Sequence, residues 1–192
     1  MGRTKSISDD SALDSVLDLI AETGPAGLTF ARAGQAARLS PATLVQRYGN
    51  RDALLEAALL RAWDRLDAET ADADAEEPLT PDGAIRILLR LMPPEAAEKN
   101  ATDGLLLLRE DIRNPVLRAR GADWGTRLAN ILGRRLDAAQ EGERLGWQMA
   151  SVWLGAQTWW AFTRNGAPDV AIRKALEDWC GSALAKNRNA PR

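Results

Sequence analysis

Residues 28–50 read LTFARAGQAARLSPATLVQRYGN, and this stretch decides the fold that the sequence predicts. Thr29 and Ser40 are residue types that cap helix N-termini, and the proline after Ser40 suits the first position of a helix. The stretch therefore predicts two short helices, at about residues 30–37 and 41–48, with a tight turn between them. Small residues would let these helices cross closely: Ala33, Gly34, Ala36 and Ala37.

Charge is segregated along the chain, although the formal net charge is only −2. No acidic residue lies between Glu22 and Asp52, and four arginines give this stretch a local charge of +4: Arg32, Arg38, Arg47 and Arg51. The stretch from Leu66 to Ile85 has the opposite character, with seven acids and no cation. Because a phosphate backbone responds to local charge, the basic stretch favours a nucleic-acid partner.

Helical periodicity continues on both sides of the opening stretch. Apolar residues at helical spacing precede Gly24-Pro25, and Asn50 can cap a fourth helix. Further cap-plus-proline pairs begin helices at Thr80-Pro81 and Asn114-Pro115. No segment alternates as a strand would, and no internal repeat is found. We expect an all-α fold of about nine to ten helices.

The third predicted helix has the composition of a recognition helix. Such a helix presents short or polar side chains at its N-terminal end to base edges in the major groove. Gln46 can pair with adenine and Arg47 with guanine, each through two hydrogen bonds, while Leu39 and Leu44 face the core. Residues 29–49 therefore predict a helix-turn-helix that binds double-stranded DNA.

The segment resembles the TetR (tetracycline repressor) family of one-component regulators. The matching residues are 28–30, 35–44 and 48–55, within a similarity that covers about residues 10–62. The resemblance implies a helix-turn-helix DNA-binding domain at 1–50 and a helical regulatory, ligand-binding and dimerisation domain at 51–188. It implies these DNA-binding residues: Thr29, Arg32, Ser40, Pro41, Ala42, Thr43, Val45, Gln46, Arg47, Tyr48 and Arg51.

Two positions depart from the family pattern. Arg38 stands at the turn position that glycine usually fills, where a positive φ would cost an arginine some energy. Val45 replaces the usual tyrosine, so it cannot donate to phosphate but can pack on a thymine methyl group. Both departures concern the details of DNA contact.

Six of the seven tryptophans lie beyond residue 120, in the part that the family uses for ligand binding and dimerisation. Two interpretations stay open for them: packing, including a dimer interface, or the lining of a cavity for an apolar or aromatic effector. The candidate ligand-binding residues are Trp63, Leu88, Leu108, Trp124, Leu128, Trp153, Gln157 and Trp160. The candidate dimer-interface residues are Gly146, Ala150, Gly155, Ala156, Trp159, Ile172 and Trp179.

The function predicted from these features is a ligand-responsive regulator, most simply a repressor, that binds a palindromic operator as a homodimer. The rival interpretations are a small helical enzyme, a helical interaction module without DNA binding, and a regulator that senses no ligand. An enzyme is disfavoured because the chain has no histidine and no phosphate-loop, dinucleotide or zinc motif. We expect no cofactor, no metal and no membrane association, and a cytoplasmic location.

Overall fold

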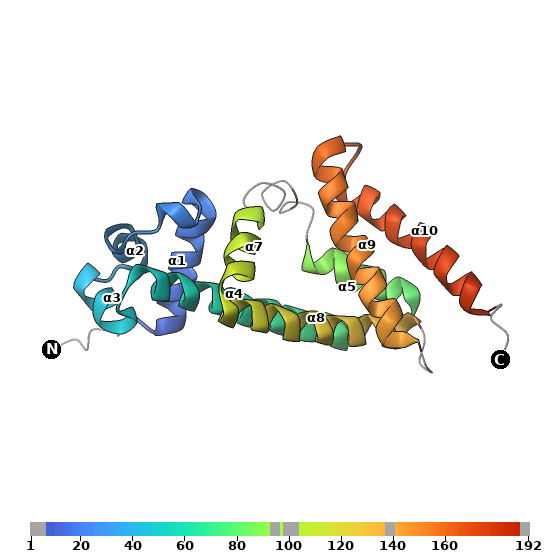
Figure 1. Ribbon diagram of the computed structural model, residues 1–192, viewed down its shortest axis with the longest axis horizontal. Coiled ribbons are helices and arrows are strands. Elements are labelled where there is room, and N and C mark those ends of the chain that lie inside the picture. Colours follow the sequence, from blue (N-terminus) through green and yellow to red (C-terminus); the bar gives the residue numbers. More distant parts are fainter. Residues whose placement is uncertain (1–6, 93–96, 98–103, 137–140, 189–192) are drawn as a thin grey trace. The chain divides into compact units, whose positions relative to one another are not determined.

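The computed structural model describes residues 7–92, 97, 104–136 and 141–188. Within these residues every regular element is a helix, which confirms the predicted fold class (Figure 1). In chain order the elements are α1 (Asp9–Thr23), the 3-10 turn η1 (Pro25–Gly27), α2 (Phe30–Ala37), α3 (Pro41–Tyr48), α4 (Arg51–Glu76), α5 (Pro81–Leu91), α7 (Gly104–Arg113), α8 (Pro115–Leu136), α9 (Gly142–Thr163) and α10 (Pro168–Arg188).

The helix N-termini lie where the capping residues predict them. In each case a side-chain oxygen accepts the backbone N–H three residues further on, which satisfies one of the free donors of the first turn. The caps of this kind are Thr29, Ser40, Asn50, Thr80 and Asn114. The start of α9 differs, because the residue before it, Glu141, makes no side-chain cap.

The chain packs as two compact units, unit 1 from Met1–Arg65 and Asp103–Gly121, and unit 2 from Leu66–Thr102 and Ala122–Arg192. Helices α4 and α8 contribute residues to both units. These units follow packing, so they do not test the predicted functional boundary at residue 50, which stays a prediction.

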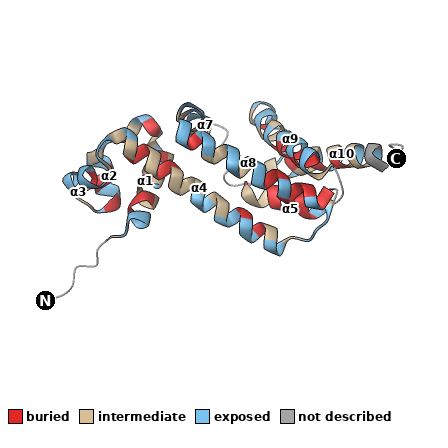
Figure 2. Ribbon diagram, turned by 60° about the horizontal axis from the view of Figure 1, so that its bottom comes forward, coloured by how far each residue is buried: buried red, intermediate tan, exposed pale blue. Residues whose placement is uncertain are grey.

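Unit 1 is built around a buried apolar cluster beneath the first four helices. The cluster joins one face of α1 to the turn before α2 and to the start of α4 (Figure 2). Its fully buried members include Val16, Leu28, Leu44 and Leu54. Arg61 on α4 also donates two hydrogen bonds to the Asp14 carboxylate, at 3.0 and 3.2 Å, and these lower the pKa of Asp14. Helix α1 is thus held to α4 by apolar packing and by an ion pair.

Unit 2 contains the larger apolar cluster. Residues of α5, α8, α9 and α10 supply most of it, among them Leu88, Leu128, Met149 and Leu176. Helix α9 lies so close to α8 that a Cβ on Gly146 would lie 1.9 Å from the carbonyl oxygen of Ala129. Helix α10 packs along α9 and α5.

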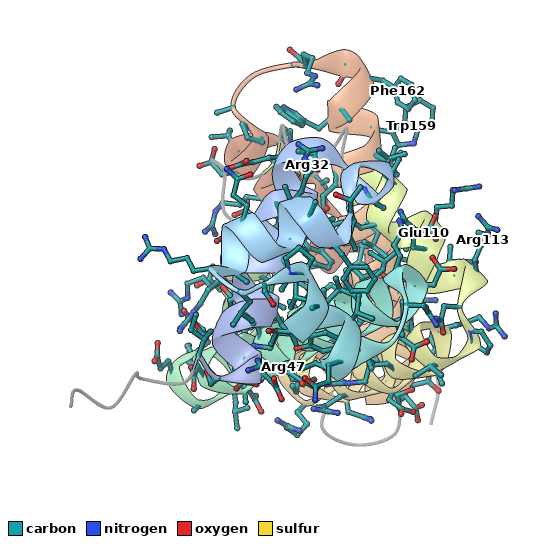
Figure 3. The ribbon with its side chains drawn as sticks, turned by 90° about the vertical axis from the view of Figure 1, so that its left-hand side faces the viewer. Arg32, Arg47, Glu110, Arg113, Trp159 and Phe162 are labelled. Carbon is teal, nitrogen blue, oxygen red and sulfur yellow. The ribbon has the colours of Figure 1, made fainter. Side chains whose placement is uncertain are left out.

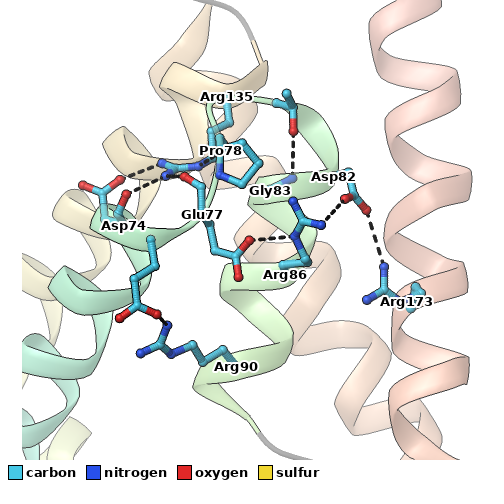
Figure 4. Close-up of polar contacts among 11 residues, drawn as sticks. Asp74, Glu77, Pro78, Asp82, Gly83, Arg86, Arg90, Arg135 and Arg173 are labelled. Carbon is cyan, nitrogen blue, oxygen red and sulfur yellow. Dashed lines mark hydrogen bonds and ion pairs between the residues drawn. The ribbon is translucent and has the colours of Figure 1, made fainter.

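A buried arginine fastens the end of α4 to α8 in unit 2 (Figure 4). Arg135 is 3% exposed, and its guanidinium donates to the Asp74 carboxylate at 2.6 Å. It also donates to the carbonyl oxygens of Glu77 and Pro78, at 2.8 and 3.0 Å. The α4 C-terminus and the turn after it therefore obtain hydrogen bonds that the helix itself cannot supply. No described helix is both long and apolar enough to span a lipid bilayer.

Candidate nucleic-acid interface

The turn between α2 and α3 depends on a left-handed residue and a close approach. Arg38 has φ 54° and ψ 39°, so the expected positive φ at this arginine is confirmed. The N–H of Leu39 donates to the carbonyl of Gly34 at 2.9 Å and closes the turn. A Cβ on Gly34 would lie 2.7 Å from the Leu39 carbonyl oxygen, so glycine is needed there. Three of the four small residues between the helices are buried, whereas Ala36 is exposed.

The N-terminal face of α3 is open to solvent, as a reading face must be. Most of its predicted contact residues are exposed, and Thr43 is half-buried. Ser40 and Thr43 lie 2.8 Å apart at their hydroxyls, within the cap of the helix. Val45 is 45% exposed, so its branched apolar side chain is not covered by the described residues. The opposite face is anchored by Leu44, which is fully buried. The exposed residues of the predicted set are Ser40, Pro41, Ala42, Val45, Gln46 and Arg47.

Arg47 is held at the first turn of α1 (Figure 3). Its guanidinium pairs with the Asp9 carboxylate at 2.8 Å and donates to the Ile7 carbonyl at 3.3 and 3.4 Å. Asp9 is largely exposed, and exposed ion pairs contribute only about 0–1 kcal/mol. Arg47 can therefore exchange Asp9 for a stronger acceptor at little cost.

Arg51 lies at the start of α4 but points inward. Its Nε donates to the Leu28 carbonyl at 3.0 Å, and its Nη2 donates to the Pro25 carbonyl at 2.5 Å. The remaining terminal nitrogen pairs with Asp52 at 3.0 Å. The sequence predicts Arg51 as a phosphate contact, whereas here its donors fasten the chain before α2 to α4. We therefore leave Arg51 out of the DNA contacts proposed below.

Two further exposed cations of this region are Arg32 and Arg38. The Arg32 side chain lies on the outer side of α2 and makes one hydrogen bond, to the Gly27 carbonyl at 3.2 Å (Figure 3). Arg38 is exposed, and its side chain has no hydrogen bond or ion pair with the described residues. Site prediction from the sequence omitted Arg38, although its place in the acid-free stretch marked it as a candidate.

Tyr48, at the end of α3, lacks the exposed hydroxyl that a hydrogen bond to phosphate needs. It is half-buried, and its hydroxyl lies out of solvent without a partner among the described residues. Burial raises the pKa of Tyr48 above its usual value. Thr29, by contrast, is exposed at the start of α2, where backbone N–H groups are available to a phosphate.

Comparison with solved structures identifies the fold. One match is a protein from Streptomyces coelicolor A3(2), described as a transcriptional regulator, with a TM-score of 0.64 at 21% identity over 88% of this chain and 95% of that chain. Another is a Rhodococcus sp. protein, described as a TetR-family transcriptional regulator, with a TM-score of 0.65 at 22% identity over 88% of this chain and 94% of that chain. The chain has the TetR-like fold. Neither a family model nor a curated protein matches the sequence.

Five of the predicted effector residues lie together in unit 2. Leu88, Leu128 and Trp153 are buried in the same apolar cluster, and Trp124 packs against it. Gln157 follows Trp153 by one helical turn on α9. Of the other three, Trp160 also lies in unit 2, buried near the end of α9, while Trp63 and the half-exposed Leu108 belong to unit 1.

The predicted dimer residues separate into three groups. Gly146, Ala150 and Ile172 are buried, so packing inside the chain accounts for them. Ala156 and Trp179 are half-buried against the cluster of unit 2. Gly155 has open space around the position of a Cβ, and Trp159 is 69% exposed. Trp159 is the most accessible of the predicted set to a second copy of the chain, and Gly155 beside it is half-buried.

Sequence reasoning missed the apolar residues beside Trp159. Trp147, Leu154 and Phe162 are 42%, 56% and 77% exposed on the same helix. Their spacings of seven and eight residues place them on one face of α9, which we call the α9 stripe. Trp159 borders the stripe and contacts Phe162, with ring centroids 6.1 Å apart (Figure 3). The helical spacing was readable in the sequence, but exposure was not.

Proposed function

We propose that this chain is a TetR-family transcriptional regulator that binds double-stranded operator DNA through α2 and α3. The observation that carries the proposal is the exposed N-terminal face of α3 in a stretch that has four arginines and no acid. A regulator of this kind acts by binding, and no catalytic residue is assigned.

In the proposed complex, α3 enters the major groove. Thr43 and Gln46 read base edges, and Val45 packs on a thymine methyl group. Arg32 and Arg38 bind phosphates, together with the free N–H groups at the start of α2. When DNA is present, Arg47 leaves Asp9 and also binds a phosphate.

A homodimer is part of the proposal, since one short helix reads too few base pairs for a specific site. A two-fold pair places two reading helices about one DNA turn apart, roughly 34–36 Å, on a palindromic operator. The α9 stripe is the face that we assign to the second copy, because an exposed apolar face of this extent is characteristic of an interface.

Repression and release by an apolar or aromatic small molecule complete the proposal. An effector bound in unit 2 would favour a state in which the two reading helices no longer match the operator. The coupling free energy needed is about 1–3 kcal/mol or more. The predicted cytoplasmic location belongs to the same proposal, since a one-component regulator acts where its operator lies.

Selection of bound duplexes from a random pool tests the proposal. We expect an enriched palindrome whose half-sites lie about one helical turn apart. Gln46→Ala should weaken binding to this duplex by about 5–150-fold, the cost of losing a bidentate base contact. Gln148→Ala, an exposed glutamine on α9, is the matched control and should bind as the wild type does.

The salt dependence of affinity separates phosphate contacts from base contacts. Arg38→Ala should weaken binding to all duplexes and reduce the slope of log K against log salt by about one unit. No enrichment of any duplex at modest salt would refute the regulator assignment, and an unchanged slope would remove Arg38 from the phosphate contacts.

A further inference from the structure

Two hydrogen-bond donors lie buried on α9 without acceptors. Trp153 is 6% exposed, and its Nε1 has no partner among the described residues. The same is true of Nε2 of Gln157, which follows by four residues. Residues at i and i+4 are neighbours on one helix face, so the two donors lie close to each other. Buried polar groups of native proteins are nearly always paired, and such exceptions need an explanation.

The other indole groups in the interior show that the fold can supply acceptors. Trp124 donates to the Thr70 hydroxyl, and Trp160 donates to the Gly166 carbonyl, both at 3.1 Å. Trp63 donates to the Asp111 carboxylate at the same distance. Trp153 differs from these three because its Nε1 has no acceptor among the described residues, and Nε2 of Gln157, one turn away, also has none. An acceptor from outside the chain would satisfy both donors together.

The surroundings of the two donors determine which acceptor fits. Trp153 belongs to the apolar cluster of unit 2 that includes Leu88, Leu128 and Met149. Among the described residues of that unit, these arginines are already engaged by acids: Arg86, Arg90, Arg127, Arg134, Arg135, Arg144 and Arg173. Arg164, further along, lies over the Trp160 ring and donates to the Ala161 carbonyl. A carboxylate brought to Trp153 would therefore lose its hydration without gaining a cation, which is unfavourable.

We propose that Trp153 and Gln157 bind the carbonyl oxygen of a neutral effector with an apolar or aromatic body. This inference rests on the effector response in the proposed function and adds the chemical class of the effector. The apolar cluster holds the body, and the two N–H groups select the molecule by its acceptor. A site built to donate hydrogen bonds discriminates strongly against an analogue that lacks the acceptor.

Three probes of one shape test the proposal on the full-length protein. Benzophenone has the carbonyl, diphenylmethane has the same two rings without it, and 4-benzoylbenzoate adds a carboxylate. Affinities come from titration of protein labelled with ¹⁵N at the indoles, in which the Trp153 signal is the one that Trp153→Phe removes. We expect benzophenone to shift the Trp153 N–H signal and to bind about tenfold more tightly than diphenylmethane. The carboxylate should bind about tenfold more weakly than benzophenone.

The variants isolate the two donors. In Gln157→Leu the preference for benzophenone over diphenylmethane should fall to about threefold, since one of the two hydrogen bonds is lost. Trp124→Phe is the matched control, because that indole already has Thr70 as its acceptor, and it should keep the full preference. If Trp153→Phe fails to fold, Gln157→Leu carries the comparison, and the Trp153 signal is assigned through its backbone neighbours on α9.

Three results would each overturn the inference: a Trp153 signal that benzophenone does not move, equal affinity for diphenylmethane, or tightest binding of the carboxylate. Duplex selection on the same preparation without a probe separates the two proposals. Specific DNA binding without carbonyl discrimination would end this inference alone. Carbonyl discrimination without specific DNA binding would end the regulator assignment and leave the binding site.

Discussion

At the scale of single residues, Arg38 occupies a backbone conformation that most side chains adopt at a cost. Its φ of 54° is left-handed, and for a residue with a Cβ this costs roughly 1–2 kcal/mol. Glycine has no such penalty but loses about 0.5–1 kcal/mol through the greater freedom of its unfolded chain. We expect the arginine to offset this cost by placing an exposed guanidinium at this position.

Arg38→Gly should therefore raise the free energy of unfolding by about 0.5–1 kcal/mol, the difference between those two terms. In a chain of this size that corresponds to about 2–4 °C in Tm for each kcal/mol, measurable by calorimetry. Arg32→Gly, inside α2, is the control and should lower Tm, since glycine destabilises a helix interior. An unchanged or lower Tm for Arg38→Gly would contradict the assignment of strain to this turn.

Asp111 is a second residue with an energetic conflict. It accepts the hydrogen bond of the Trp63 indole at 3.1 Å, yet burial raises the pKa of its carboxyl above 3.8. A raised pKa in the folded state means that stability is present at low pH and is lost as pH rises through that pKa. Asparagine could accept the same hydrogen bond without a charge to desolvate.

Asp111→Asn should consequently be more stable than the wild type at pH 7, and its advantage should disappear as pH falls below 3.8. Urea denaturation of both proteins from pH 3.5 to 7 measures the difference in their free energies of unfolding. Groups that titrate in the same way in both proteins cancel in this difference. If the difference were constant across this range, or grew towards low pH, the burial of a charged Asp111 would not be the cause.

At the scale of secondary-structure elements, one arginine connects α4, the following turn and α8. Replacing Arg135 with methionine would leave several carbonyl groups without their donor and would leave the Asp74 carboxylate paired with Arg134 alone. Removal of one partner from a buried ion pair costs about 3–5 kcal/mol, so Arg135→Met should lower the free energy of unfolding by that amount. Urea denaturation followed by tryptophan fluorescence measures it.

Arg134→Met is the matched control for that experiment. Arg134 pairs with the same Asp74 at 2.7 Å, but its side chain is 53% exposed. Exposed pairs contribute about 0–1 kcal/mol, so this variant should change stability by no more than that. Equal losses for the two variants would show that burial of Arg135 contributes nothing beyond an ordinary surface pair.

At the scale of the whole molecule, the proposed function requires two copies of the chain. A charge on the α9 stripe should prevent their association, because it would have to be buried against apolar partners. Phe162→Glu should therefore shift the protein from dimer to monomer in light scattering and lower its affinity for the selected duplex. Leu79→Glu is the control, since Leu79 is 68% exposed on the turn before α5 and outside the stripe. A dimer that persists in Phe162→Glu would place the interface elsewhere.

The features that could be predicted from the sequence depend on local chemistry. Helix ends at Thr29, Ser40 and Asn50, and the strained turn at Arg38, depend on residues within a few positions of one another, so they could be read directly. The exposed N-terminal face of α3 follows from the same spacing once Leu44 is assigned to the core. Both the helix boundaries of the helix-turn-helix and the exposed face of α3 were therefore predictable.

The partners of side chains that reach residues far along the chain could not be predicted without the folded structure. Four arginines share the acid-free stretch, yet Arg47 reaches back to Asp9 and Arg51 reaches the carbonyls before α2, while Arg32 and Arg38 face solvent. In the same way, periodicity cannot tell a small residue that packs inside the chain, such as Gly146, from one open to a partner. Periodicity fixes which residues share a face, whereas burial and pairing depend on which other element packs there.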